Sequence, residues 1–267
     1  MDISSAQDFV ANAMYEAASQ YRKEAPRAYL GMSSIGRECS RSIWYSFRGF
    51  TPLEVEGRAI MIFRLGDRVE DEVVDWLTRA GYTVSDRQRS FSALGGLFNG
   101  HWDGQIEGVT KKPHVLEIKS ANAKRFKAYQ ISGIRKISPE YYAQVQCYMG
   151  YSGLDRALFV VMCKDTCEIY TERIPFVEGD FKDIERKASE ILTSNRPPDK
   201  TETALCEWCS YKFLCNGMPA VQKRKTCGTC SHCEVKPDYH ILCKLHDREI
   251  KKWGRYCEQW EYMNENH

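Results

Sequence analysis

The chain has 267 residues, 43% of them hydrophobic and 12% aromatic, so it can bury a core in one domain of about 200 residues with a small appendage. Its formal net charge of +2 excludes a uniformly basic surface, so any nucleic-acid-binding surface must be local. No basic leader precedes an apolar stretch and no apolar run has transmembrane length, so we expect a cytoplasmic protein without membrane contact.

Hydrophobic periodicity predicts two helices in the first third of the chain, over residues 2–23, ended by Pro26, and over residues 58–80. The apolar stripe expected on the second helix consists of Ile62, Leu65, Val69, Val73, Trp76 and Leu77. Between residues 82 and 120 the period changes to that of strands joined by glycine-rich turns, which predicts a meander of three or four strands.

The second half of the chain continues the alternation of helices and strands. A helix is predicted over residues 139–149, two strands over 157–162 and 168–174, and a last helix over 180–194. This order predicts an α/β fold.

A basic linker, Gln222-Lys-Arg-Lys225, precedes a cysteine-rich tail. We therefore expect a main domain at residues 1–221 and a small module at 222–267. The module is too short to bury a core of its own, so a bound metal should supply much of its folding energy.

Cysteines in a cytoplasmic chain are expected to be thiols or metal ligands. Cys206, Cys209 and Cys215 form one closely spaced group, and Cys39 stands alone near the other end of the main domain. Four thiolates that bracket the domain indicate a metal cluster that ties its two ends together. Spacing leaves three alternatives open: an iron–sulfur cluster, zinc, or no metal. Zinc sites more often use two Cys-x2-4-Cys knuckles, whereas iron–sulfur clusters use four thiolates.

Two carboxylates and a lysine form the chemically most informative pattern. Asp103 lies in Gly100-His-Trp-Asp-Gly104, and Glu117-Ile-Lys119 ends an apolar run. On a strand, Glu117 and Lys119 share a face that Asp103 on a neighbouring strand can meet. Carboxylates bind Mg²⁺ or Mn²⁺, and a lysine beside the metal can orient water and stabilise charge at phosphorus. The pattern predicts phosphodiester hydrolysis, with solvated strand charges as the alternative.

Two helices add residues to this pattern. Gln144 and Tyr148 are four residues apart and share one helix face. Glu70 lies on the apolar side of its helix, where a charge needs a metal or a basic partner. His101 is expected to point outward from its strand. The segment from Lys119 to Lys136 has six basic residues and no acid, with Phe126 and Tyr129 as expected base-stacking surface for DNA.

These motifs resemble the PD-(D/E)XK nuclease superfamily, in the RecB-like branch that includes AddB-type helicase-nucleases and iron–sulfur CRISPR adaptation nucleases. The resemblance covers roughly residues 30 to 218. It is carried, in the family's order, by Cys39-Ser-Arg, Gly66-x3-Glu70, Gly100-x2-Asp103, Glu117-x-Lys119, Gln144-x3-Tyr148 and the Cys206 group. It implies a restriction-endonuclease-like mixed β-sheet core flanked by helices.

The resemblance also implies a role for each matched residue. Asp103 and Glu117 would bind Mg²⁺ or Mn²⁺ together with the Ile118 carbonyl, and Lys119 would serve the attacking water. Gln144 and Tyr148 would orient active-site groups or DNA. Two departures from the family are Glu70, where many members have histidine, and Trp102, where the superfamily's name places proline. A carboxylate at Glu70 still suits a metal.

For the cysteines, the resemblance implies a 4Fe-4S cluster held by Cys39, Cys206, Cys209 and Cys215. The tail is a separate case: the ligands expected for Zn²⁺ there are Cys227, Cys230, Cys243 and Cys257. Cys233 or His246 can replace one of them. Basic residues around this module suggest contact with DNA or docking of a protein. Cys147, Cys163 and Cys167 are expected to be buried thiols.

These features predict a metal-dependent DNA exonuclease that acts at DNA ends, most of all single-stranded ones, in recombination, repair or replication in a phage or bacterium. The chain has no Gly-x4-Gly-Lys-Ser/Thr motif, which would indicate a helicase motor. Recombination or replication proteins are therefore expected partners. One alternative is a catalytically inactive DNA-binding or assembly subunit of a recombination or CRISPR adaptation complex. Another is a regulatory protein with iron–sulfur and zinc sites.

Overall fold

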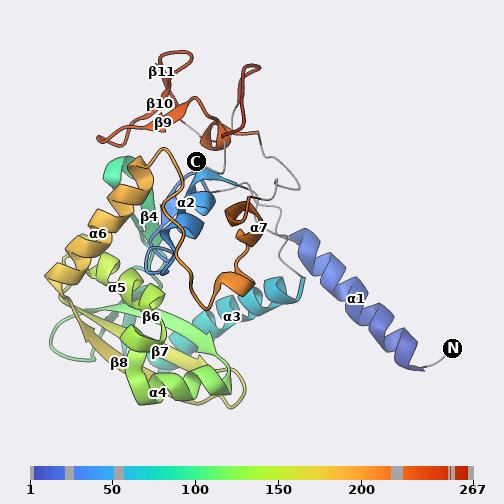
Figure 1. The fold of residues 1–267 in the computed structure, drawn as a ribbon. Helices are drawn as coiled ribbons and strands as arrows, with labels where there is room; N and C mark the ends of the chain where they lie inside the picture. Colours follow the sequence, from blue (N-terminus) through green and yellow to red (C-terminus); the bar gives the residue numbers. More distant parts are fainter. Residues whose placement is uncertain are drawn as a thin grey trace.

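The computed structural model describes residues 3–21, 27–50, 57–217, 225–251, 253 and 256–263, whose helices and strands are shown in Figure 1. The helices are α1 (Ile3–Tyr21), α2 (Ser40–Arg48), α3 (Gly57–Arg79), α4 (Ala123–Ile137), α5 (Pro139–Ser152), α6 (Glu178–Thr193) and α7 (Lys212–Cys215). The strands are β1 (Leu30–Gly31), β2 (Thr83–Ser85), β3 (Ser90–Ala93), β4 (Phe98–His101), β5 (Gly104–Glu107), β6 (His114–Ala121), β7 (Arg156–Cys163), β8 (Ile169–Pro175), β9 (Cys233–Val235), β10 (Ile241–Cys243) and β11 (Arg248–Glu249).

The main sheet has five strands in the order β2-β5-β6-β7-β8. β6 and β7 are parallel and place Glu117 beside Phe159, whereas the other neighbouring strands are antiparallel. A parallel pair needs a crossover, which α4 and α5 supply between β6 and β7. The predicted mixed sheet flanked by helices is therefore confirmed.

The predicted meander is wrong, because the strands between residues 82 and 120 belong to two sheets. β3 pairs with β4, and β4 also pairs with β1 in a separate three-stranded sheet. The chain passes from this sheet to the main one between His101 and Gly104, through Trp102 and Asp103. Trp102 is fully buried and anchors this step by donating its indole N–H to Asp86 O at 2.7 Å.

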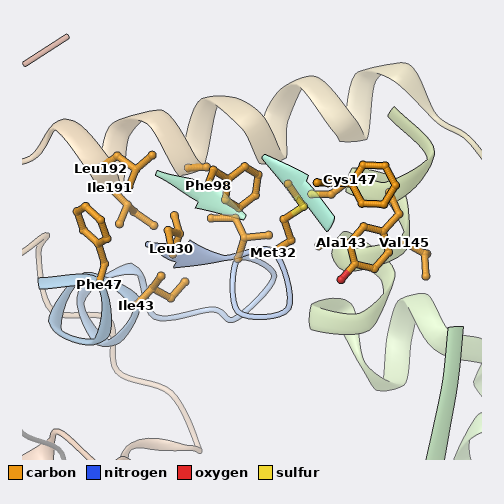
Figure 2. Packing of buried hydrophobic residues seen from close by; sticks show 14 of the residues in the cluster. Leu30, Met32, Ile43, Phe47, Phe98, Ala143, Val145, Cys147, Ile191 and Leu192 are labelled. Carbon is orange, nitrogen blue, oxygen red and sulfur yellow. The ribbon is translucent and has the colours of Figure 1, made fainter. Parts of the chain in front are cut away.

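The larger hydrophobic core lies between the two sheets and α2, α5 and α6. Figure 2 shows Leu30 of β1 and Phe98 of β4 beside Ile191 of α6 and Ile43 of α2, and Met32, which follows β1, on the side of Ala143 and Cys147 of α5. A second buried cluster joins α3 to the other face of the main sheet. Its members are Val69, Val73, Val74, Ile106, Leu116, Ile118, Leu158 and Val160.

Helix α3 confirms the predicted helix but corrects its apolar stripe. Val69 and Val73 are buried against the sheet, whereas Ile62, Leu65 and Trp76 are exposed. The first turns of α3 extend beyond the sheet toward α1, so periodicity alone overstated the buried face. α1 projects from the body in Figure 1, and its predicted end at Pro26 lies outside the described residues.

Two helices lie where periodicity predicted none. α2 directly follows Cys39, and α4 occupies most of the basic segment after β6. α4 contains Gly133, whose positive φ of 69° interrupts the helical conformation and weakened its signal in the sequence. Within the described ranges, none of the helices combines the length and apolar character that a membrane crossing requires.

The three short strands β9, β10 and β11 form an antiparallel sheet beside α2 and α6, at the top of Figure 1. Val235 and Ile241 belong to the same buried cluster as the core of the main sheet. Asn195 Oδ1 accepts a hydrogen bond from Val235 N at 3.2 Å, which ties the end of α6 to β9. The boundary predicted at residues 221 and 222 lies among residues 218–224, outside the described part of the chain.

Candidate active site

Strand β6 and the step between β4 and β5 bring Asp103, Glu117 and Lys119 together. Glu117 is 0% exposed and Asp103 is 8% exposed. Asp103 Oδ2 accepts a hydrogen bond from Ile118 N at 2.6 Å, so the carboxylate is held against the backbone of β6. Side chains alternate along β6, so Glu117 and Lys119 lie on one face while Ile118 is buried against α3 on the other.

Lys119 is held by its neighbours on the same strand. Its Nζ donates to Glu117 Oε1 and, at 3.1 Å, to Ile118 O. The ammonium group also lies 5.2 Å from the ring centroid of Tyr141, a cation–π distance. Burial lowers the pKa of Lys119, but the charges of Glu117 and Asp103 outweigh burial and raise it overall. Lys119 is therefore a fixed positive charge in this site.

Glu70 approaches the same site from α3. Its Oε1 accepts hydrogen bonds from Gln88 Nε2 at 2.8 Å and from Arg87 Nη2 at 3.2 Å. Burial and the charge of Asp103 raise the pKa of Glu70, although Arg87 and Gln88 lower it in part. The carboxylate of Glu70 thus belongs electrostatically to the Asp103 cluster.

Glu117 is the most buried carboxylate of the cluster, and the positive charge of Lys119 does not fully offset its burial. Burial, and then the charge of Asp103, raise the pKa of Glu117 to about 8, although Lys119 acts against this rise. Glu117 Oε2 is buried and has no hydrogen-bond partner among the described residues. A buried oxygen without a partner beside a second carboxylate fits a divalent cation, whose preferred ligands are carboxylate oxygens.

No group of three or more His, Cys, Asp or Glu side chains is arranged to hold a metal ion as it stands, within the residues that the structure describes. In the acidic cluster, the carboxylates are held apart by ion pairs: Lys119 contacts Glu117, and Arg87 contacts Glu70. These contacts would have to loosen for all three carboxylates to share one ion.

Gln144 and Tyr148 join α5 to the end of β4. Gln144 Nε2 donates to Tyr148 Oη at 3.0 Å, and the Tyr148 hydroxyl donates to His101 O at 2.5 Å. Burial, and then the charge of Glu117, raise the pKa of Tyr148, which marks its proximity to the acidic cluster. Gln144 Oε1 is buried without a partner in the described part of the chain. The side chain of His101 is exposed, as expected.

Gly100→Ala is expected to disturb this arrangement. An added Cβ would lie 2.9 Å from Tyr148 Cε1 and 2.9 Å from Met32 Cβ, so these buried groups would have to move. Such overpacking costs about 1–3 kcal/mol, and displacement of Tyr148 should also slow any reaction in the site. Thermal unfolding measures the loss. Gly179→Ala is the control, since its Cβ meets nothing within 4 Å, and an equal effect of both variants would refute this explanation.

The structure also brings together Cys39, Cys206, Cys209 and Cys215, which line one cavity of 340 Å³. Cys39 is the N-cap residue of α2, Cys206 begins the short helical turn Cys206–Trp208, and Cys215 ends α7. Burial raises the pKa of Cys209, and the other three cysteines contribute to the rise. Residues far apart in the sequence thus meet at one cavity.

The cysteines of the tail form a second group. Burial raises the pKa of Cys227, with smaller contributions from the charges of Cys230, Cys243 and Cys257, although among the described residues these cysteines are not arranged to hold a metal ion. Cys257 Sγ lies 3.3 Å from His246 Nε2. Cys233 is buried, and burial raises the pKa of its thiol to about 12.

Three expectations about other residues need correction. Phe126 and Tyr129 are 3% and 1% exposed, so they belong to the core and cannot stack on DNA bases. Amphipathic packing of α4 under the sheet explains their burial, while the basic residues of α4 remain on its outer face. Cys147 and Cys163 are buried as expected, but Cys167 is exposed, in a turn with φ of 60°.

Sequence reasoning missed Tyr141, Arg87 and Gln88. Tyr141 lies three residues before Gln144, so helical spacing could have placed it on the same face as the site. Arg87 and Gln88 lie in the loop between β2 and β3, where no periodicity exists to indicate their direction.

Comparison with known proteins gives one family match: residues 64–155 match the model of the YqaJ-like viral recombinase domain. No curated protein gave a significant match to the chain.

Among solved structures, SSO0001 is 18% identical, with a TM-score of 0.47 over 80% of this chain and 98% of that one. An alkaline exonuclease from Laribacter hongkongensis is 17% identical, with a TM-score of 0.47 over 66% of this chain and 90% of that one. A phage-related exonuclease from Haemophilus somnus 129PT is 14% identical, with a TM-score of 0.37 over 47% of this chain and 66% of that one.

The segment that matches the family model contains all six residues predicted to act in catalysis. They are Glu70, Asp103, Glu117, Lys119, Gln144 and Tyr148. Over this segment the chain is similar to the YqaJ-like viral recombinase domain.

Proposed function

We propose that this chain is a divalent-metal-dependent deoxyribonuclease that hydrolyses phosphodiester bonds at DNA ends. The observation that carries the proposal is the buried cluster of Asp103, Glu117 and Lys119, in which Glu117 Oε2 lacks a partner among the described residues. A charged buried carboxylate is costly, and Lys119 contacts only its other oxygen, Oε1, so a divalent cation fits at Oε2. Similarity to a viral recombinase domain supports a role in DNA recombination.

Asp103, Glu117 and the Ile118 carbonyl are the proposed ligands of Mg²⁺ or Mn²⁺, with Glu70 as a further carboxylate. When bound, such an ion would stabilise the negative charge that develops at the scissile phosphate. Asp103 is already oriented by its hydrogen bond from Ile118 N, so it needs little reorganisation to bind. Glu70 would have to leave Arg87, which could then contact a DNA phosphate.

Lys119 is proposed to orient the attacking water and to stabilise charge at phosphorus. Its Nζ reaches both Glu117 and Ile118 O, so it stands beside two of the proposed ligands. Gln144 and Tyr148 are proposed to position the site, since their hydrogen bonds link α5 to the backbone next to Asp103. Their hydrogen bonds support a role in holding the site more than a role in the reaction.

The proposal is tested with end-labelled linear DNA, single- and double-stranded, and with closed circular DNA, in the presence of Mg²⁺ or Mn²⁺. The wild-type protein is expected to degrade linear DNA from its ends and to leave circles intact. Lys119→Met, which retains the length of the side chain without its charge, is expected to lose at least about 100-fold in rate.

Two other results of this assay would change the conclusion. Cleavage of circular DNA would make the enzyme an endonuclease. If metal-loaded wild-type protein leaves every substrate intact but binds DNA, the nuclease proposal is wrong and the inactive DNA-binding subunit is supported. Lys111→Met is the matched control, because Lys111 is an exposed lysine in the turn before β6. This variant should cleave DNA at the wild-type rate.

For the first cysteine group we propose a 4Fe-4S cluster held by Cys39, Cys206, Cys209 and Cys215. Its support is that the four cysteines are among the residues that line one cavity of 340 Å³, and that iron–sulfur clusters are held by four thiolates. Iron and sulfide analysis of anaerobically purified protein tests it. Colourless protein that contains zinc alone would refute the iron–sulfur assignment.

For the tail we propose one Zn²⁺ bound by Cys227, Cys230, Cys243 and Cys257. Its support is the Cys-x2-Cys spacing of Cys227 and Cys230 and the contribution that Cys230, Cys243 and Cys257 each make to the raised pKa of Cys227. His246 contacts Cys257 and is therefore placed to hydrogen-bond a zinc-bound thiolate. Recombination or replication proteins remain the proposed partners of the complete protein.

A further inference from the structure

Helix α5 turns three side chains toward the candidate site from one face. Tyr141, Gln144 and Tyr148 are three and four residues apart, so they lie along one stripe of the helix. Tyr148 donates a hydrogen bond to His101 O at the end of β4, and Gln144 donates to Tyr148. Tyr141 lies at the other end of the stripe, beside Lys119. The helix therefore contacts both β6 and the end of β4, the two segments that bring the site together.

The ring of Tyr141 is itself held by two neighbouring elements. Its centroid lies 6.3 Å from that of Phe159 on β7, with an angle of 38° between the rings, and Phe159 is the strand partner of Glu117. From α4, the guanidinium carbon of Arg125 lies 6.0 Å from the ring centroid. Arg125 Nη2 donates to Ser138 Oγ at 2.6 Å, which ties the start of α4 to the start of α5. The half-buried ring is thus fixed by packing before any substrate binds.

Lys119 needs a support of this kind. Its side chain has a flexible four-carbon stem, and holding such a stem in one rotamer costs conformational entropy. Its two hydrogen-bond acceptors, Glu117 Oε1 and Ile118 O, belong to the same strand as the lysine. The Tyr141 ring, with its centroid 5.2 Å from Lys119 Nζ, adds a contact from a different element. It therefore fixes the ammonium group relative to α5 as well as to β6.

The contact between Lys119 and Tyr141 depends on the ring and not on its hydroxyl. Burial raises the pKa of the Tyr141 hydroxyl, so the side chain is uncharged at neutral pH. An uncharged aromatic ring attracts an ammonium group through the electrons of its face, and the attraction is stronger where water is partly excluded. The Lys119 side chain is only 22% exposed. A phenylalanine ring can replace this contact, whereas an aliphatic side chain of similar size cannot.

We propose that Tyr141 is a positioning residue of the candidate site, whose ring holds the Lys119 ammonium group in the place from which it acts on a DNA phosphate. The inference rests on the proposed nuclease function and deepens it, because it explains how a flexible lysine is oriented. Tyr141 acts through Lys119 and needs no contact of its own with DNA. With Gln144 and Tyr148, it makes α5 the element that orients Lys119 relative to Asp103.

The first experiment measures DNA cleavage by the full-length chain over a range of DNA concentrations with Mg²⁺. Tyr141→Leu is expected to lower kcat about 10-fold, the rate equivalent of a cation–π contact of about 1.4 kcal/mol. KM for DNA should change by less than about 2-fold, because the lost contact orients a reacting group and does not bind DNA. Tyr141→Phe retains the ring and should recover most of the loss in kcat. A wild-type kcat in Tyr141→Leu, or equal losses in the two variants, overturns the proposal.

Tyr142→Leu is the matched control for the packing of α5. Tyr142 is the next residue of the helix, and it has a cation–π contact of its own, with the guanidinium carbon of Arg135 4.9 Å from its ring centroid. Its hydroxyl donates to Asp180 Oδ2 at 2.6 Å. These contacts lie outside the candidate site, so this variant should cleave DNA with the wild-type kcat. A loss as large as that of Tyr141→Leu would assign the effect to the stability of α5 and overturn the proposal.

The second experiment does not depend on cleavage and follows Lys119 by NMR in protein with an isotope label at lysine Cε. The Lys119 signal is the one that Lys119→Met removes. The ring current of Tyr141 should displace this signal from those of exposed lysines. The displacement should persist in Tyr141→Phe and disappear in Tyr141→Leu, and an unchanged signal in Tyr141→Leu refutes the contact. Wild-type protein that cleaves no DNA refutes the proposed nuclease, and with it a role of Tyr141 in cleavage, whereas the NMR result still decides the contact.

Discussion

Replacing Asp103 by Asn should lower the rate of DNA cleavage by at least about 100-fold, because it removes one of the two central carboxylates proposed to bind the metal. Asn can still accept the hydrogen bond that Ile118 N donates to Asp103 Oδ2, so the fold should persist. The loss of charge also relieves the repulsion that raises the pKa of Glu117. In the absence of metal, the variant should therefore be at least as stable as the wild type.

Thermal unfolding with and without Mg²⁺ separates this explanation from simple unfolding. A ligand that binds only the native state at 100 times its Kd stabilises it by about 2.7 kcal/mol. Wild-type protein should show such a rise in Tm, and Asp103→Asn should lose most of it. Glu107→Gln, on the exposed side of β5, is the matched control and should behave like the wild type. Full activity of Asp103→Asn would contradict the proposed site.

Replacing Trp102 by Ala is expected to give the largest loss of stability. Trp102 is 0% exposed, its ring centroid lies 4.9 Å from that of Phe91, and its indole N–H donates to Asp86 O. Removal of a buried Trp side chain costs about 3–5 kcal/mol. At about 2–4 °C per kcal/mol for a chain of this size, Tm should fall by roughly 6–20 °C. Cleavage should fall too, because Trp102 precedes Asp103.

Trp76→Ala provides the control for this substitution. Trp76 is 59% exposed on α3, so its removal should change stability by no more than about 0.5 kcal/mol. Thermal unfolding of both variants by circular dichroism measures the difference. Similar losses for the two would show that burial at the step between β4 and β5 is not what stabilises the fold.

The two sheets show which features of strands can be predicted from the local sequence pattern and which cannot. Alternation along β6 correctly placed Glu117 and Lys119 on one face, because the period of side chains in a strand is a local property. The strands from β2 to β5 were recognisable, but their division between two sheets was not. Pairing depends on which hydrophobic faces meet, and that is decided by elements far away in the sequence.

Helix α4 shows a local prediction that tertiary packing overturned. Its basic residues were visible in the sequence, and their number favoured a DNA-binding surface with aromatic stacking. Phe126 and Tyr129 instead face the core, because a helix that covers a sheet must turn its apolar side chains inward. A list of residue types could not assign these two rings to the inner face.

The sequence by itself determined the residue types and spacings that carry the chemistry: the Asp103, Glu117 and Lys119 pattern, the Gln144 and Tyr148 pair, and two cysteine groups. Only the tertiary structure decided that Asp103 binds Ile118 N and that Arg48 Nη2 of α2 donates to Cys233 O of the tail. Spacing records which residues share a strand or helix face, whereas these contacts arise from packing between elements far apart along the chain.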